Sequence, residues 1–166
     1  LYADGVNTHN DLPAILAFGA QYEILKNLRA MVSYHYYFDK DARMDHDKQK
    51  ALSSNSQEYL AGMEWDVTKH LTVSAGGQRT KYGLGNGDYL SDMSYVTSSY
   101  SVGFGAKLKI AKNMSLNVAY FWTDYEHFHK SYDQTITAAG HSVDVHNTDV
   151  FTRSNKVLGV GLDIDL

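Results

Sequence analysis

Two histidines in an aromatic stretch have the residue type and spacing of a metal or haem ligand pair. His127 and His129 flank Phe128, so an extended backbone places both imidazoles on one side, about 7 Å apart. A metal ion or haem iron needs a third ligand, which His141 or His146 could supply. The alternative is a solvated loop with incidental histidines, which we favour because no pattern indicates residues that would orient the ligands. We therefore expect no cofactor. If a metal were bound, His127 and His129 would be its candidate ligands.

Carboxylates two positions apart offer a second kind of chemistry. The pairs are Glu64 with Asp66 and Asp163 with Asp165. Two acids on one face of a strand could serve a glycosidase or a protease. No nucleophile elbow and no Ser-His-Asp order accompanies them, so the sequence predicts that the protein is not an enzyme. Acidic pairs more often line a wet interior, where we expect Lys107 and Lys109 to balance their charge.

Two polar segments invite other interpretations. Residues 83–88 are glycine-rich, but a phosphate-binding loop needs a lysine and a helix directly afterwards, and neither follows. Residues 39–56 are mixed in charge and are compatible with a short helix or with contact to lipopolysaccharide cations. We expect both segments to be loops, because Gly, Asn, Asp and Ser favour turns.

Three short turns at a constant interval indicate the elements that position these residues. Lys26, Lys69 and Lys112 recur every 43 residues, and a glycine precedes each lysine by seven positions. Each turn is flanked by segments that alternate apolar and polar residues, and the connections between these units are long and polar. Strand, short turn, strand and long loop is the succession typical of a transmembrane β-barrel.

The alternation predicts seven strands, each with an apolar face for lipid and a face of Gly, Ser and charged residues for a wet interior. Leu60 and Phe121 break the pattern on the polar side. Arg79 breaks it on the apolar side, toward the long-loop end, where a charge in lipid costs less. The predicted strands are 12–24, 28–38, 58–67, 71–82, 101–110, 114–123 and 157–166.

The polar positions of these strands are the predicted lining of the barrel lumen. They are Gln21, Glu23, Glu64, Asp66, Gln78, Lys107, Lys109 and Asn117. Aromatic residues cluster at the two ends of the strands, as the interfacial girdles of a membrane barrel do.

Composition excludes several classes. The 166 residues suffice for one domain, and a net charge of -4 without a basic stretch gives no nucleic-acid footprint. There is no cysteine, hence no disulfide and no thiolate metal site. No apolar run approaches the roughly 18 residues of a membrane helix. The chain opens at Leu1 without a visible signal peptide, so we expect an upstream region.

A soluble β-barrel or sandwich would bury the same apolar faces. Its outer face would then be rich in Gly and Ser rather than in Lys and Glu, and three long connections on one side are uncommon in a compact domain. The sequence therefore favours an all-β fold, a transmembrane antiparallel up-and-down β-barrel in the bacterial outer membrane. Bacterial barrels have an even number of strands. Seven strands thus predict that residues 1–166 are the C-terminal half of a barrel of about fourteen strands, unless residues 1–10 or 142–150 supply an eighth.

Two segments carry a resemblance to a known family. Residues 11–22, with Leu12-Pro13 before a glycine-containing strand, resemble FadL/TodX-type outer-membrane transporters of long-chain fatty acids and hydrocarbons. Residues 155–162 are similar to the final strand of that family, and the Lys-Asn turns suggest a Bacteroidetes member. The family is a fourteen-stranded barrel plugged by an N-terminal hatch. Residues 1–166 contain no counterpart of the hatch, and they end in Leu166 rather than in the usual aromatic residue.

The resemblance implies passive uptake of hydrophobic compounds such as long-chain fatty acids. Two alternatives stay open: a non-transporting barrel subunit of a larger outer-membrane secretion or assembly complex, and a general porin. The expected partners are outer-membrane lipid and lipopolysaccharide, a hydrophobic small molecule and other outer-membrane proteins, with no nucleic acid.

Overall fold

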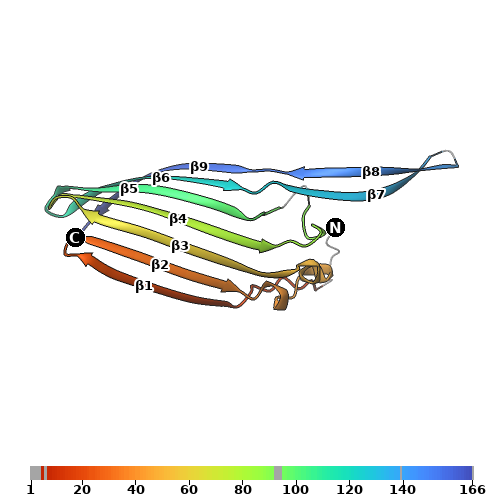
Figure 1. Cartoon of the computed structure of the whole chain (residues 1–166), viewed down its shortest axis with the longest axis horizontal. Helices are drawn as coiled ribbons and strands as arrows, with labels where there is room; N and C mark the ends of the chain where they lie inside the picture. The colour runs from red at the N-terminus through yellow and green to blue at the C-terminus, as the bar shows by residue number, and fades with distance from the viewer. Residues whose placement is uncertain (1–4, 6, 92–94, 139, 166) are drawn as a thin grey trace.

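The protein is an open antiparallel sheet of seven strands from which a two-stranded hairpin extends, as the computed structural model in Figure 1 shows. It describes residues 5, 7–91, 95–138 and 140–165. The sheet has the order β1-β2-β3-β4-β5-β6-β9. Its strands are β1 (Ile15–Leu25), β2 (Leu28–Tyr37), β3 (Ser54–Asp66), β4 (Leu71–Gly83), β5 (Ser99–Ala111), β6 (Met114–Tyr125) and β9 (Ser154–Ile164).

The predicted strands and short turns are present, so the expectation of an all-β antiparallel fold is confirmed. The turns at Lys26, Lys69 and Lys112 lie together at one end of the sheet, which we call the turn end (Figure 1). The long connections lie at the opposite, loop end. The main difference in boundaries is that β3 begins at Ser54, four residues before the predicted start, because its first residues pair with the end of β4.

Register divides the side chains of the sheet into two faces. Residues paired directly across antiparallel strands point to the same side, so Tyr22, Ala30, Met63, Ala75, Phe104, Tyr120 and Leu158 share one face. We call this the apolar face. The opposite side, the polar face, carries rows such as Glu23, Arg29, Glu64, Ser74, Gly105, Ala119 and Gly159.

The sheet does not close on itself, and β1 and β9 are its two edges. Each neighbouring pair is antiparallel. Since the sheet has seven strands, the two edge strands run in the same direction, from the loop end to the turn end. They therefore could not pair with each other in an antiparallel manner.

The segment between β6 and β9 is a hairpin rather than the loop that the sequence predicts. Strands β7 (Phe128–Ala138) and β8 (His141–Phe151) pair along their whole length and project beyond the loop end (Figure 1). The suggested eighth strand at 142–150 does lie within β8, but it pairs only with β7 and does not join the seven-stranded sheet. Of the other suggestion, residues 1–10, positions 1–4 and 6 lie outside the described part, and Asn10 forms an isolated bridge with Met44.

A small apolar core lies at the loop end, where the hairpin meets the connection between β4 and β5. Leu84, Leu90 and Phe151 are buried there, and the partly buried rings of Tyr82, Tyr89, Tyr95 and Phe128 pack against them. Gly87 has a φ of +85° and lies so close to Phe128 that a Cβ would be 2.5 Å from the ring. The glycine-rich loop is thus packed in place. The short helix considered for 39–56 is present as two 3-10 turns, η1 (Asp39–Asp41) and η2 (Asp45–Ala51).

Candidate functional site

The apolar face of the sheet is exposed along its whole width. Phe18, Phe104 and Leu158 expose 61%, 61% and 71% of their surface, although they lie on three separate strands. The single arginine that interrupts the predicted alternation, Arg79, lies at the loop end, as expected. Its guanidinium lies 3.8 Å from the ring centre of Tyr100 and forms an ion pair of 2.6 Å with Glu126.

The polar face carries every residue that the sequence predicts to line a lumen. Their register partners place Gln21, Glu23, Glu64, Asp66, Gln78, Lys107, Lys109 and Asn117 on this one side. These residues divide into a polar network at the turn end, a network at the loop end, and a hollow between the two.

The network at the turn end is centred on Arg29. Its guanidinium lies 2.6 Å from Glu64 Oε1 and 2.9 Å from Asp66 Oδ2, and the Thr72 hydroxyl donates to Asp66 at 2.7 Å. The expectation that Lys107 and Lys109 balance Glu64 and Asp66 is wrong, because both lysines lie on β5, which is separated from β3 by β4. Strand β2 instead pairs with β3 and places Arg29 directly opposite Glu64. Both carboxylates accept hydrogen bonds from one guanidinium, which is the arrangement of an ion pair rather than of a general acid or base.

The expected lysine contribution is found near the β9 edge of the sheet, where Lys107 of β5 reaches across β6 to β9. Lys107 Nζ lies 3.2 Å from Asp163 Oδ2, and the Asn117 amide donates to the same oxygen at 2.9 Å. The predicted balancing of the terminal acidic pair is therefore correct for Asp163.

The network at the loop end is centred on Glu58, which sequence reasoning did not select. Its side chain is only 16% exposed. The Tyr37 hydroxyl donates to it at 2.7 Å, the Gln78 amide donates at 3.0 Å, and His35 Nδ1 lies at 3.1 Å. The partners come from β2 and β4, on either side of β3, so only knowledge of the strand order could have identified this cluster.

Between the two networks, three neighbouring strands each place a glycine at the same level of the polar face. Gly62, Gly76 and Gly103 are consecutive register partners, and we call them the glycine floor. Met31 and Phe121 continue the row on its two sides. A Cβ on Gly76 would lie 3.0 Å from the carbonyl oxygen of Ala61, which is tighter than an ordinary side-chain contact, so a side chain here would require the strands to shift slightly.

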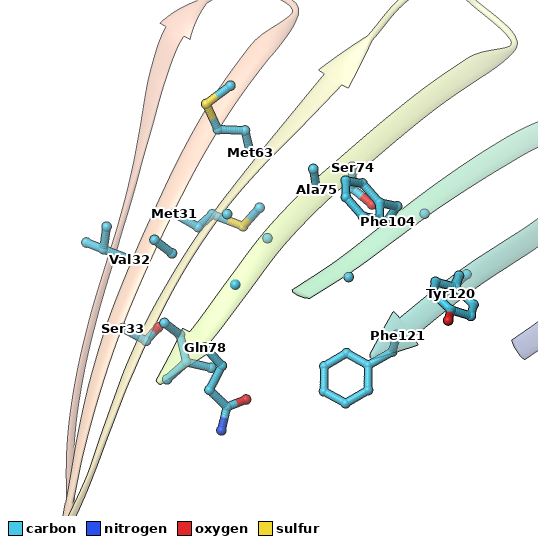
Figure 2. A pocket seen from close by; sticks show the side chains of 18 residues that line it. Met31, Val32, Ser33, Met63, Ser74, Ala75, Gln78, Phe104, Tyr120 and Phe121 are labelled. Carbon is cyan, nitrogen blue, oxygen red and sulfur yellow. The ribbon is translucent and has the colours of Figure 1, made fainter. Parts of the chain in front are cut away.

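The glycine floor is the base of a hollow of about 490 Å³. Figure 2 shows Met31 and Phe121 on opposite sides of the strands that carry the glycines, with Gln78 toward the loop end. Leu60 also lines the hollow. Leu60 and Phe121, which break the predicted alternation on the polar side, are therefore walls of one apolar space together with Met31. The size of this space is typical for small-molecule sites.

The histidines considered as metal ligands are not brought together. His127 lies in the break between β6 and β7, and His129 pairs with Val150 in the hairpin. His146 is four residue pairs further along, about 13 Å at the rise of a strand, and its Nδ1 contacts Asp133 at 2.7 Å. No group of three or more His, Asp or Glu side chains with metal-binding geometry exists among the described residues.

Comparisons of the chain with protein-family models, with curated proteins and with solved structures found no match. No helix within the described part of the chain is long and apolar enough to cross a bilayer.

Proposed function

We propose that the chain is part of the wall of a bacterial outer-membrane β-barrel that takes up hydrophobic compounds passively. The observation that carries this proposal is the exposed apolar face of the seven-stranded sheet. Soluble monomers rarely expose a continuous apolar surface of this extent. A lipid bilayer would cover it, while the polar face would line an aqueous lumen. The FadL/TodX-type resemblance of residues 11–22 and 155–162 points to the same function.

The energetics favour lipid over water as the environment of this face. Removing one large apolar side chain such as Phe104 or Leu158 from water gains about 1.5–3 kcal/mol. A cation in the middle of the bilayer costs about 2–4 kcal/mol, and the cost falls toward the interfaces. Arg79 lies at the loop end, where its charge is compensated by Glu126. The gain from many exposed apolar side chains therefore outweighs the cost of this one charge.

The direction of the edge strands supports the half-barrel interpretation. Lipid offers no hydrogen-bond partner to the free edges of β1 and β9, so further strands must cover them. Because both edges run in the same direction, antiparallel closure needs an odd number of added strands whose outer members run the opposite way. A second copy inserted with its long loops on the same side would present strands in the wrong direction. Seven strands from another segment would meet the requirement.

The hollow supports a transport function rather than a purely structural one. The glycine floor leaves space at mid-height of the polar face, and Met31, Leu60 and Phe121 make that space apolar. An apolar solute crossing a wet lumen would gain from such a site. A water-filled porin would have no use for apolar walls there.

The test is native mass spectrometry of the protein gently extracted from its outer membrane. A single chain of roughly twice the mass of these residues, as fourteen strands require, with a bound lipid-like molecule would support the proposal. A chain of 18.6 kDa that behaves as an isolated, folded particle would overturn the half-barrel interpretation. A strong ion conductance in planar bilayers without ligand binding would favour a general porin.

A second candidate function, a non-transporting subunit of an outer-membrane secretion or assembly complex, is favoured by the hairpin. Strands β7 and β8 project past the loop end, and Tyr132, Ile136 and Val143 expose 40%, 50% and 61% of their surface there. A docking role would need this surface. Removing residues 129–150 should then abolish recovery of stoichiometric partner chains, whereas uptake of a hydrophobic compound would be unchanged if the protein is a transporter.

A further inference from the structure

Charged side chains border the hollow at both of its ends. Four charged residues on the polar face are each two positions along a strand from a residue that lines the hollow. They are Glu58 next to Leu60, Glu64 next to Gly62, Arg29 next to Met31 and Lys107 next to Gly105. A solute in the hollow would therefore meet these four side chains at its two ends. Their hydrogen-bond partners decide which kind of head group it can present.

Neither cation at this border is free to receive an anion. Arg29 is bonded through separate nitrogens to Glu64 and to Asp66, so one guanidinium already compensates two carboxylates. Lys107 is paired with Asp163. A carboxylate head group would have to displace one of these intramolecular partners or remain without a counter-ion in a partly desolvated space.

The opposite end of the hollow is also unsuited to an anion. Glu58 is bonded to Tyr37, Gln78 and Thr80 and lies beside His35, without a lysine or arginine partner among the described residues. Gln78, which lines the hollow, directs its amide nitrogen toward Glu58 rather than toward the space. A negative head group would therefore meet a second negative charge, and the side-chain donors that line the hollow beside it are uncharged hydroxyls such as that of Ser33.

We propose that the hollow takes an uncharged apolar molecule and rejects the carboxylate form of a fatty acid. This inference rests on the proposed uptake function and narrows its substrate class to neutral compounds such as hydrocarbons and esters. The apolar walls supply affinity, and the two acidic borders supply the discrimination. Repulsion from a carboxylate about 7 Å away, at an effective dielectric constant of about 20, is sufficient for a preference of at least ten-fold.

The test compares two ligands that differ only in charge. Radiolabelled dodecanoate and its methyl ester are incubated with the full-length protein in a neutral maltoside detergent at pH 9, where the acid is ionised. Bound label is measured after gel filtration, with empty detergent micelles as the blank. The expected result is saturable binding of the ester and at least ten-fold weaker binding of dodecanoate.

A matched pair of variants locates the binding. Leu60→Trp fills the hollow and should abolish ester binding. Leu108→Trp makes the same replacement on the apolar face, where Leu108 is 43% exposed, and should leave binding unchanged. Equal losses in the two variants, or no loss in Leu60→Trp, would place the ligand elsewhere and overturn the inference.

A charge variant tests the cause of the preference. The double replacement Glu64→Gln and Asp66→Asn keeps the shapes of both side chains and frees Arg29, so dodecanoate binding should rise at least ten-fold while ester binding stays within two-fold. Wild-type protein that binds dodecanoate as well as the ester would overturn this inference and leave the uptake function standing. Failure of both ligands to bind would overturn the uptake function together with it.

Discussion

The seven-stranded sheet and the β7–β8 hairpin are continuous in the chain, yet their side chains are distributed differently. Strand β6 leads into β7 after a two-residue break, and β8 leads into β9 in the same way. The sheet has one apolar face across all of its strands. One face of the hairpin is instead a row of side-chain hydrogen bonds: Ser131 with Thr148, Asp133 with His146, Thr135 with Asp144 and Thr137 with Ser142.

The difference follows from the surroundings of the two regions if the sheet lies in a membrane as proposed. A strand with one face in lipid needs an apolar residue at every second position, so its alternation is strict. A strand in water can be stabilised by backbone pairing and by polar pairs across the hairpin, and its apolar residues can be few. The hairpin consequently lacks the pattern from which the sheet is predicted, although its backbone pairing is just as regular.

The largest expected effect on stability comes from placing a charge on the apolar face of the sheet, compared with the same charge on the hairpin. Phe104→Lys places a cation in the middle of the apolar face and should lower the free energy of unfolding in lipid bilayers by about 2–4 kcal/mol. Val143→Lys makes a similar change in the hairpin and should stay within about 0.5 kcal/mol. Urea unfolding in liposomes measures both. Equal effects of the two replacements would mean that the apolar face does not contact lipid.

A smaller effect is expected at the turn-end network of the sheet. Arg29→Met leaves Glu64 and Asp66 side by side on β3 without a cation, and should lower the midpoint of urea unfolding in liposomes. Lys107→Met is the control, because the Lys107–Asp163 pair is more than half exposed and such pairs contribute less than about 1 kcal/mol. A cost for Lys107→Met equal to that for Arg29→Met would show that Arg29 holds no special position.

The glycine floor should give a smaller effect again. A Cβ on Gly76 would lie 3.0 Å from a backbone oxygen that cannot move freely, so Gly76→Ala should cost about 1–2 kcal/mol. At Gly159 the nearest atom is 4.0 Å from the added Cβ, and Gly159→Ala should cost nothing measurable. Thermal unfolding in detergent compares the two variants. If Gly76→Ala does not lower the stability, strands β3 and β4 are further apart at this level than the structure indicates.

The smallest effect is expected in the loops, which belong to neither region. The Arg43 guanidinium donates to Asp11 at 3.0 Å and holds the pKa of that carboxyl below its usual range. Because the pKa is lowered in the folded state, the stabilisation is present above the unfolded pKa and is lost as the pH falls through the folded one. Arg43→Gln should raise the Asp11 titration midpoint in NMR toward the ordinary value. An unchanged midpoint would show that the pair does not form in solution.

Local sequence patterns were sufficient for the strands and for the two faces of the sheet. Alternation and the repeated turns at Lys26, Lys69 and Lys112 predict which side chains share a face, because the side-chain period of a strand is fixed at two. For the same reason all eight polar residues selected from the sequence lie on the polar face. The sequence does not predict the hairpin because the face opposite its polar pairs also carries polar residues, among them Lys130, Gln134 and Asp149, so apolar and polar positions do not alternate.

The contacts within the site were decided only by the tertiary structure. The sequence repeat groups Gly62 with the glycines 43 residues before and after it, whereas the register groups Gly62 with Gly76 and Gly103. Likewise, Arg29 meets Glu64 and Glu58 meets Gln78 because their strands are neighbours with a particular register. Periodicity along one strand contains no information about which residue of the next strand lies opposite. The faces of this protein are thus a local property of its sequence, and the hollow with its acidic borders is a product of strand pairing.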